Sequence, residues 1–271
     1  MTHELRLFFI ALQFFTRVPV PAWVGFQPEW LNHSARYFPL VGACVGAAGA
    51  GVLWAAGLVW PPAVAVGLSM AATMLITGGF HEDGLADTFD ALGGAVSRER
   101  ALEIMKDSRI GSYGALALLT VLGLKAAALV ALASMSSISS ITLLAVPPAL
   151  PALLFAHTAS RAAATTLIFA LPYAGDVAHA KAKPLAQRIS LAGLVVAWVS
   201  ALAVGAAAAA SCGLPLSWFV VSVAAAVLGC AGCGAWLRHR LGGTTGDGLG
   251  ATQQITELLM LLAALAWARF A

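Results

Sequence analysis

One run of acidic residues stands out in this chain of 271 residues, between positions 81 and 90. Asp83 and Asp87 are four residues apart and Asp90 follows three residues later, so on a helix the three carboxylates share one face. Carboxylates that close repel one another unless a cation compensates them. Mg²⁺ prefers oxygen ligands and usually binds substrate phosphates as well. Glu82 is a further candidate ligand, and His81 could join the site or flank it.

A second acidic row follows, in which Glu99, Glu103 and Asp107 are spaced by four residues. Basic residues are interleaved with it, so a solvated helix with ordinary ion pairs is an equally good interpretation. Lys106 and Arg109, at the end of this segment, are candidates for binding phosphate oxygens, because an arginine fork suits phosphate.

The third candidate element is the glycine-rich loop at positions 242–250, which leads directly into the last apolar segment. A glycine-rich loop at the start of a helix exposes backbone N–H groups and can cradle phosphate. Thr244, Thr245 and Gly246 are therefore candidate substrate-binding residues, and Asp247 is a candidate metal ligand. A flexible turn is the alternative interpretation of the same residues.

These elements sit in a chain whose composition predicts a membrane protein. Hydrophobic residues make up 60% of it and charged residues only 10%, with a mean hydropathy of +0.87, whereas soluble domains contain about 25% charged residues. Seven segments approach the roughly 20 apolar residues that a spanning helix needs. They cover about 38–59, 62–79, 113–134, 138–157, 190–210, 215–236 and 251–268.

We therefore expect an all-α integral membrane protein of about seven spans that forms one polytopic domain, residues 1–271. Pro61 and Pro62 should separate the first two spans, because proline cannot continue a helix interior. Three prolines between positions 147 and 151 predict a kink in the fourth span. The apolar stretch 162–171 is too short to cross alone, which suggests a re-entrant or interfacial helix.

The charges predict an orientation. Thirteen of the 15 basic residues fall on one side of these spans, and Arg161 is among them. The two exceptions are Lys125 and Arg269. The positive-inside rule makes that side cytoplasmic, with the amino terminus inside and the carboxy terminus outside. Eleven of the 12 acidic residues lie on the same side, Glu257 being the exception. The net charge of only +3 gives no sign of nucleic-acid binding.

Lys125 and Glu257 lie inside predicted spans, where ionisable residues are functional by default. Lys125 could instead pair within the bundle, and Glu257 is close enough in sequence to the glycine-rich loop to reach a metal or a substrate hydroxyl. Apolar residues between Leu5 and Phe15 recur at helical spacing, which predicts an amphipathic helix on the membrane surface or against the bundle. The four cysteines are expected to be packing residues.

Several separated motifs resemble the cobalamin synthase family, the adenosylcobinamide-GDP ribazoletransferases. The similarity spans most of the chain and rests on Phe14–Pro21, Gly78–Asp87, Met105–Gly111 and Gly243–Ala251. It implies a multi-span enzyme of the bacterial inner membrane that requires Mg²⁺ and works at the cytoplasmic face. Such an enzyme joins adenosylcobinamide-GDP to α-ribazole or its 5′-phosphate, giving adenosylcobalamin or its 5′-phosphate and GMP. The family pattern often has Leu where this chain has Glu82.

On this basis we expect Asp83, Asp87 and Asp90 to hold one or two Mg²⁺ ions that bridge the pyrophosphate. The ribazole 3′-hydroxyl would attack the phosphorus that stays with cobinamide. Asp87 or Asp90 would take its proton, with His81 as an alternative base. The sequence leaves open the number of metal ions and whether the chain forms a homo-oligomer in the lipid bilayer.

Two rival hypotheses remain at this point. CDP-alcohol phosphotransferases share an Asp-Gly-x-x-Ala core, but they carry Arg where this chain has Asp87, and their later aspartate spacing is missing. A cation-coupled transporter is favoured only by Lys125 and Glu257, and its charges would sit near the membrane midplane.

Overall fold

The structure is a computed structural model that describes residues 2–135, 147–175 and 186–270. Within those residues the chain forms helices and connecting turns, and its single β-bridge joins Tyr173 to Thr244. Six helices are long and apolar enough to cross a membrane, or seven if one bent pair is counted as a span. The predicted all-α, multi-span architecture is therefore confirmed.

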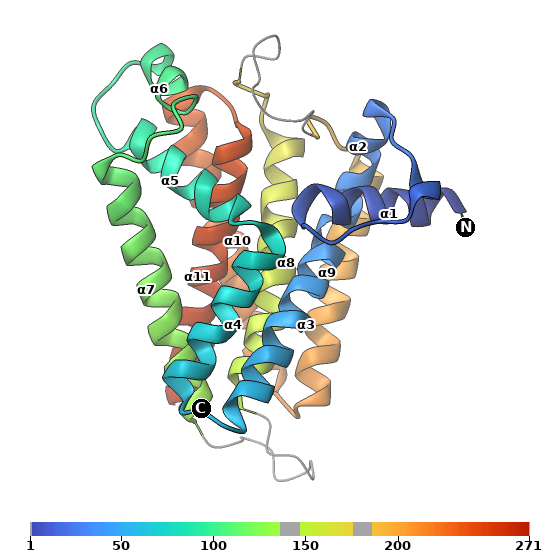
Figure 1. The fold of residues 1–271 in the computed structure, drawn as a ribbon, viewed down its shortest axis with the longest axis vertical. Coiled ribbons are helices and arrows are strands. Elements are labelled where there is room, and N and C mark those ends of the chain that lie inside the picture. Colours follow the sequence, from blue (N-terminus) through green and yellow to red (C-terminus); the bar gives the residue numbers. More distant parts are fainter. Residues whose placement is uncertain (1, 136–146, 176–185, 271) are drawn as a thin grey trace.

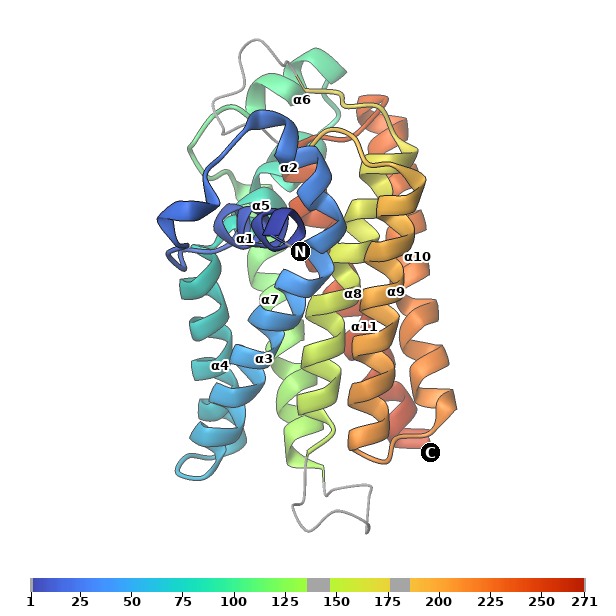
Figure 2. The ribbon, with the colours of Figure 1, turned by 90° about the vertical axis from the view of Figure 1, so that its right-hand side faces the viewer.

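The six long helices run side by side along the long axis of the molecule (Figures 1 and 2). They are α3 (Phe38–Gly57), α7 (Ser112–Ser134), α8 (Ala149–Ala170), α9 (Leu191–Ser211), α10 (Leu216–Leu241) and α11 (Gly246–Phe270). The shorter α4 (Pro62–Thr77) runs beside them and continues, after a sharp bend, into α5 (Phe80–Leu92). The short helices α2 (Pro28–Ser34) and η2 (Ala35–Tyr37) lead without a break into α3.

The bend between α4 and α5 is made by two consecutive glycines. Gly78 and Gly79 both have φ of 71°, in the left-handed region that ends helices and that glycine adopts at little cost. The two helix axes consequently differ by 88°. The predicted span 62–79 thus ends at Thr77, and the acidic run forms a separate helix that crosses the end of the bundle (Figure 1).

The predicted fourth span was wrong in its bounds, as far as the described residues show. The helix runs from Ala149 to Ala170, so 162–171 continues the span and is no re-entrant segment. The prolines produce no kink, because Pro148 precedes the helix and Pro151 lies in its first turn, where no backbone hydrogen bond is lost. Arg161, predicted to lie in a cytoplasmic loop, is buried within α8. Positions 138–146 lie outside the described residues.

Glycines on α3 let it approach α8 closely. A side chain at Gly42 would collide with the backbone oxygen of His157, and one at Gly46 would come within 3.1 Å of the Cα atom of Leu154. Small residues at such positions are how membrane helices gain close packing. Gly42 and Gly46 thus bring α3 close to α8.

The amino-terminal helix α1 (Thr2–Phe15) lies across the axes of the long helices (Figures 1 and 2). Its apolar face buries Leu7, Ile10, Ala11 and Phe15, and part of that face packs against the start of α3. The expected amphipathic helix is therefore present and packed against the bundle. Two further short elements complete the fold, η1 (Ala22–Val24) and α6 (Arg98–Ile104).

The carboxy terminus lies at the end of the bundle opposite to α5 and α6 (Figure 1). This arrangement agrees with an odd number of spans, and the compartment that each end faces remains a prediction. We expect a cysteine at position 97, in a chain lacking its native cysteines, to react with an impermeant maleimide only from the cytoplasmic side. Ser211→Cys, at the other end of α9, should react only from outside. The reverse pattern would place α5 and α6 outside the cell.

Candidate active site

A polar cleft opens where α4 turns into α5. We call it the acidic cleft, and its volume is about 510 Å³, within the usual range for ligand pockets of 300–1,000 Å³. Its lining is Arg17, Thr77, Gly78, Gly79, Phe80, Glu82, Asp83, Ala86, Asp87, Ser108, Ile110 and Leu118. The cleft therefore collects residues from the end of α1, the glycine turn, α5, and the start of α7.

The carboxylates of the acidic cleft are close enough to affect one another. The pKa of Asp87 is raised to about 7, first by burial and then by the negative charges of Asp83, Asp247 and Asp90. Among the described residues no basic side chain forms an ion pair with Asp83 or Asp87. The cleft thus holds an excess of negative charge that a bound cation would compensate.

Asp247 reaches this cluster because α5 and α11 cross closely. A side chain at Gly84 would come within 3.0 Å of the Asp247 backbone oxygen and 3.3 Å of the Cα atom of Gly250. Only a glycine at position 84 allows the first turn of α11 to lie this near α5. The predicted candidates Asp83, Asp87 and Asp247 are thereby brought together from segments 160 residues apart, since 247 less 87 is 160.

Asp90 has a different set of partners. Its two carboxylate oxygens accept hydrogen bonds from the backbone N–H groups of Gly111, at 2.7 Å, and Gly114, at 2.8 Å. A side chain on either glycine would collide with the carboxylate. Asp90 therefore caps the start of α7 and fixes it to α5, and it does not line the acidic cleft.

Glu82 does line the acidic cleft, with one oxygen engaged and one available. Its Oε1 accepts a hydrogen bond from Nε2 of Gln254 at 3.1 Å, while its Oε2 is buried and has no hydrogen-bond partner in the part of the chain that the structure describes. A buried acceptor without a donor is costly. Oε2 of Glu82 is consequently available to a metal ion or a substrate.

The other predicted substrate-binding residues lie elsewhere. Thr245 uses its hydroxyl to cap α11, accepting from the N–H of Gly248 at 3.0 Å, and Thr244 is buried beside it. Arg109 pairs with Asp107 at 2.9 Å from Nε, and its side chain is 87% exposed. Lys106 is exposed and does not line the cleft. The segment between α6 and α7 contributes Ser108 and Ile110 instead.

Lys125 and Glu257 meet in the middle of the bundle. The Nζ atom of Lys125 lies 2.6 Å from Oε1 of Glu257, and Nδ1 of His157 lies 3.0 Å from its other oxygen. Nε2 of Gln253 donates to that same oxygen. Glu257 is wholly enclosed, so it does not reach the cleft. Lys125 therefore pairs within the bundle, which was one of the two interpretations of this residue from the sequence.

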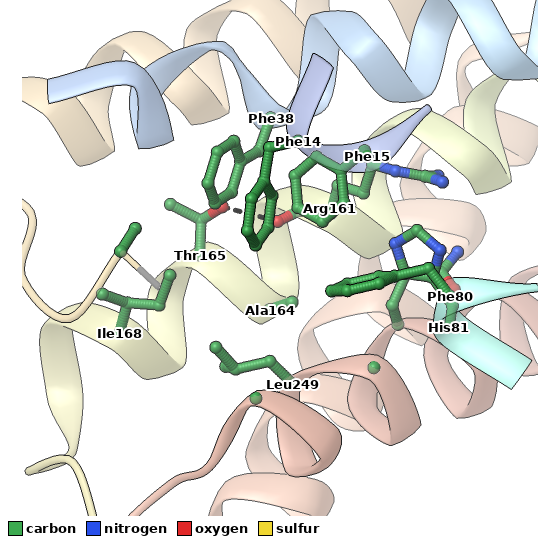
Figure 3. Close-up of a pocket in the computed structure, with 14 residues that line it drawn as sticks. Phe14, Phe15, Phe38, Phe80, His81, Arg161, Ala164, Thr165, Ile168 and Leu249 are labelled. Carbon is green, nitrogen blue, oxygen red and sulfur yellow. Dashed lines mark hydrogen bonds between the residues drawn. The ribbon is translucent and has the colours of Figure 1, made fainter. Parts of the chain in front are cut away.

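His81 faces a second cavity, on the other side of α5, which we call the aromatic pocket (Figure 3). Its imidazole ring stacks on Phe15, with centroids 5.3 Å apart and planes inclined by 17°. Gly246, from the glycine-rich loop, also lines this pocket. His81 and Gly246 are therefore not among the residues that line the acidic cleft.

In the part of the chain that the structure describes, no three His, Cys, Asp or Glu side chains converge tightly enough to hold a metal ion by themselves. Mg²⁺ often binds through only one or two carboxylates and completes its octahedron with waters and substrate phosphates. Asp83, with Asp87 and Asp247 near it, fits that mode of binding.

Comparison with known proteins decides the family. The model of the cobalamin-5-phosphate synthase family matches residues 7–265. The chain belongs to the cobalamin-5-phosphate synthase family. The adenosylcobinamide-GDP ribazoletransferase of Leptothrix cholodnii is 58% identical over 270 residues, covering 98% of this chain and 97% of the relative. The protein of the same name from Shewanella amazonensis is 45% identical over 268 residues, or 97% and 95%. No solved structure gave a significant match.

Membership of the cobalamin-5-phosphate synthase family makes the chain a transferase of cobalamin biosynthesis. This outcome agrees with the resemblance seen in the sequence motifs. It decides against the two rival hypotheses, a CDP-alcohol phosphotransferase and a cation-coupled transporter.

Arg17 is a charged residue of the acidic cleft that the sequence argument missed. Arg17 lines the cleft, and its guanidinium lies against the glycine turn, where a side chain at Gly78 would be 2.6 Å from its Nε atom. Its backbone N–H also donates to the oxygen of Ile76 at 2.8 Å. Arg17 lies in the motif Phe14–Pro21 that carried the family resemblance, which was the available signal.

Proposed function

We propose that this chain transfers the adenosylcobinamide phosphate group from adenosylcobinamide-GDP to α-ribazole or its 5′-phosphate and releases GMP. The observation that carries the proposal is the acidic cleft, which Asp83 and Asp87 line together with Arg17 and in which neither carboxylate forms an ion pair with a described residue. An excess of carboxylates beside one guanidinium suits a phosphate-bearing substrate that arrives with a divalent cation. The names of the close relatives supply the substrates.

In this proposal Asp83 and Asp247 would hold Mg²⁺, and waters and substrate phosphates would complete its coordination. The Oε2 atom of Glu82, which has no hydrogen-bond partner among the described residues, lies in the same cleft. When bound, the ion would neutralise charge on the pyrophosphate and on the departing GMP. The residues fit such an ion because their charges are mutually uncompensated and one buried oxygen lacks a donor. Asp90 is left out of the set, because both of its oxygens are engaged by α7.

The chain's own residues then have defined tasks. Arg17 binds non-bridging phosphate oxygens, which its planar fork suits. The 3′-hydroxyl oxygen of the ribazole forms a bond to the cobinamide-side phosphorus as the bond from that phosphorus to the bridging oxygen breaks. GMP departs with that electron pair. Asp87, which lines the cleft without a hydrogen-bonded partner among the described residues, receives the proton of the hydroxyl.

The proposal places the enzyme in the bacterial inner membrane with the acidic cleft facing the cytoplasm. The support is the charge asymmetry of the sequence together with the position of α5 at one end of the bundle (Figure 1). A soluble nucleotide-activated substrate would reach the cleft from that side.

The decisive experiment is an assay of purified protein with adenosylcobinamide-GDP, α-ribazole and Mg²⁺. We expect equal amounts of GMP and a cobalamin product, loss of both with EDTA, and recovery when Mg²⁺ is restored. Parallel reactions with α-ribazole 5′-phosphate give the acceptor preference. GMP release without an acceptor would indicate hydrolysis instead of transfer, and turnover in EDTA would remove the metal assignment.

A further inference from the structure

The aromatic pocket is separate from the acidic cleft, although Phe80 lines both. Four phenylalanine rings form much of its wall, together with aliphatic side chains from α8 and α11 (Figure 3). These rings are Phe14, Phe15, Phe38 and Phe80. They contact one another edge to face or stacked, with centroids 4.5–6.0 Å apart. Such a wall favours a flat, largely apolar ligand that can stack.

Two nitrogen atoms in this pocket have no hydrogen-bond partner among the described residues. Nε2 of His81 and Nε of Arg161 are both buried without a hydrogen bond, and the two side chains are 3% and 2% exposed. They lie together at one end of the pocket, beside Phe15 (Figure 3). A buried polar nitrogen without a partner is costly. Nε of Arg161 is always a donor, and Nε2 of His81 donates in the tautomer that carries its proton there, so a ligand that supplies a hydrogen-bond acceptor would satisfy both.

The pocket is poor in acceptors of its own. Its one side-chain amide, Gln253, uses Nε2 for Ser160 and Glu257, and its Oε1 accepts from Gln254. No Asp or Glu side chain lines the pocket in the described part of the chain. A guanine base presents N–H donors along one edge, and no carboxylate among the described lining residues is there to accept them. A ring with an acceptor nitrogen and no N–H group matches the donors that are present.

We propose that the aromatic pocket binds the heteroaromatic base of the acceptor nucleoside, a flat ring with one acceptor nitrogen, and that His81 and Arg161 recognise that nitrogen. This inference rests on the proposed function, since an N-substituted benzimidazole such as the base of α-ribazole has this chemistry. Phe80 then separates the base from the acidic cleft, where the ribose hydroxyl reacts. Gly246 and Gly250, both lining the pocket, bring the start of α11 against the ligand.

The pocket is small, about 30 Å³ as it stands. Entry of a ring requires the phenylalanine side chains to move apart, and a flat ring needs the least movement. Phe14 and Phe15 lie at the end of α1, which packs on the outside of the bundle (Figure 2). A lipid acyl chain could also enter, but it would leave the His81 and Arg161 nitrogens unpaired.

The test is equilibrium binding of two matched probes, 1-methylbenzimidazole and 1-methylindole, to the full chain in detergent. The two have the same shape, and only the first has an acceptor nitrogen. We expect the first to bind about tenfold more tightly, because the second leaves buried donors unpaired. α-Ribazole should displace it. Equal binding of the two probes, or displacement by GMP or by phospholipid, would overturn the proposal.

A pair of variants on α8 gives the control. Ala164→Phe fills the pocket and should weaken probe binding and raise the KM for α-ribazole about tenfold or more, leaving the KM for adenosylcobinamide-GDP unchanged. Ala170→Phe makes the same change at an exposed position of the same helix and should alter neither. His81→Phe keeps the stacking on Phe15 and should abolish the preference for 1-methylbenzimidazole. An unchanged preference in that variant would exclude His81 as the recognising residue.

The binding readout does not depend on turnover. If the wild-type chain binds 1-methylbenzimidazole selectively but produces no cobalamin, the proposed function fails and the pocket assignment stands. If turnover is normal and Ala164→Phe changes neither binding nor the KM for α-ribazole, the pocket assignment fails alone.

Discussion

Asp83→Asn should reduce the rate of GMP release by more than about 100-fold, the scale of losing one preorganised electrostatic contact to a transition state. The amide has nearly the same shape but carries no charge, so it is a poor ligand for Mg²⁺. Asp83 is exposed on the side of α5 that faces the acidic cleft. The variant protein should therefore insert and purify as the wild type does.

The matched control is Glu99→Gln, which neutralises an exposed acid on α6, outside the cleft. Its rate of GMP release should stay within about twofold of wild type, since solvent and salt screen an exposed charge that lies outside the cleft. Measurement of GMP by chromatography at several Mg²⁺ concentrations distinguishes a weakened metal site from a lost one. Full activity of Asp83→Asn at ordinary Mg²⁺ would contradict the metal assignment.

The second large effect concerns the ion pair inside the bundle. Glu257→Gln should destabilise the protein by about 3–5 kcal/mol, because Lys125 then stays buried without its counter-charge. Lys125 is only 5% exposed, and its other partner is the neutral amide of Gln254 at 2.9 Å. We expect the temperature of inactivation in detergent to fall by roughly 10 °C.

Adding Lys125→Met to this variant should recover at least half of the loss, since it removes the uncompensated charge and keeps the volume. Thermal unfolding followed by size-exclusion chromatography measures both variants. The two single changes and the double change form a cycle that isolates the coupling. Purely additive losses would mean that Lys125 and Glu257 do not act as a pair.

Hydropathy and proline positions were enough to predict the fold class and the first hairpin. α4 begins at Pro62, where the sequence predicted the break, and α3 begins at Phe38, as expected. The bounds of α8 could not be predicted in this way. Polar side chains around Arg161 interrupt the apolar run, although neighbouring helices bury them. A hydropathy average over a sequence window scores such residues as unsuitable for a span, because it does not include the neighbouring helices that bury them.

Spacing along α5 correctly predicted that the aspartates share a helical face. It could not predict which groups each carboxylate contacts. Asp90 lies seven residues from Asp83, or about 10 Å along the axis, and there it meets the start of α7 instead of the cleft. Arg17 lines the cleft and Asp247 lies near its carboxylates, and the two come from opposite ends of the chain. The aromatic pocket is likewise assembled from several helices, so no local pattern in the sequence marked it.

The double-glycine turn before α5 sets the angular register of everything on that helix. Successive residues of an α-helix are rotated by about 100°, so one residue inserted after Gly79 would swing the aspartates out of the acidic cleft and carry His81 away from Phe15. The same insertion in the loop before α6 would leave both cavities intact. Length variation in related chains should therefore be tolerated after α5 and strongly disfavoured before it.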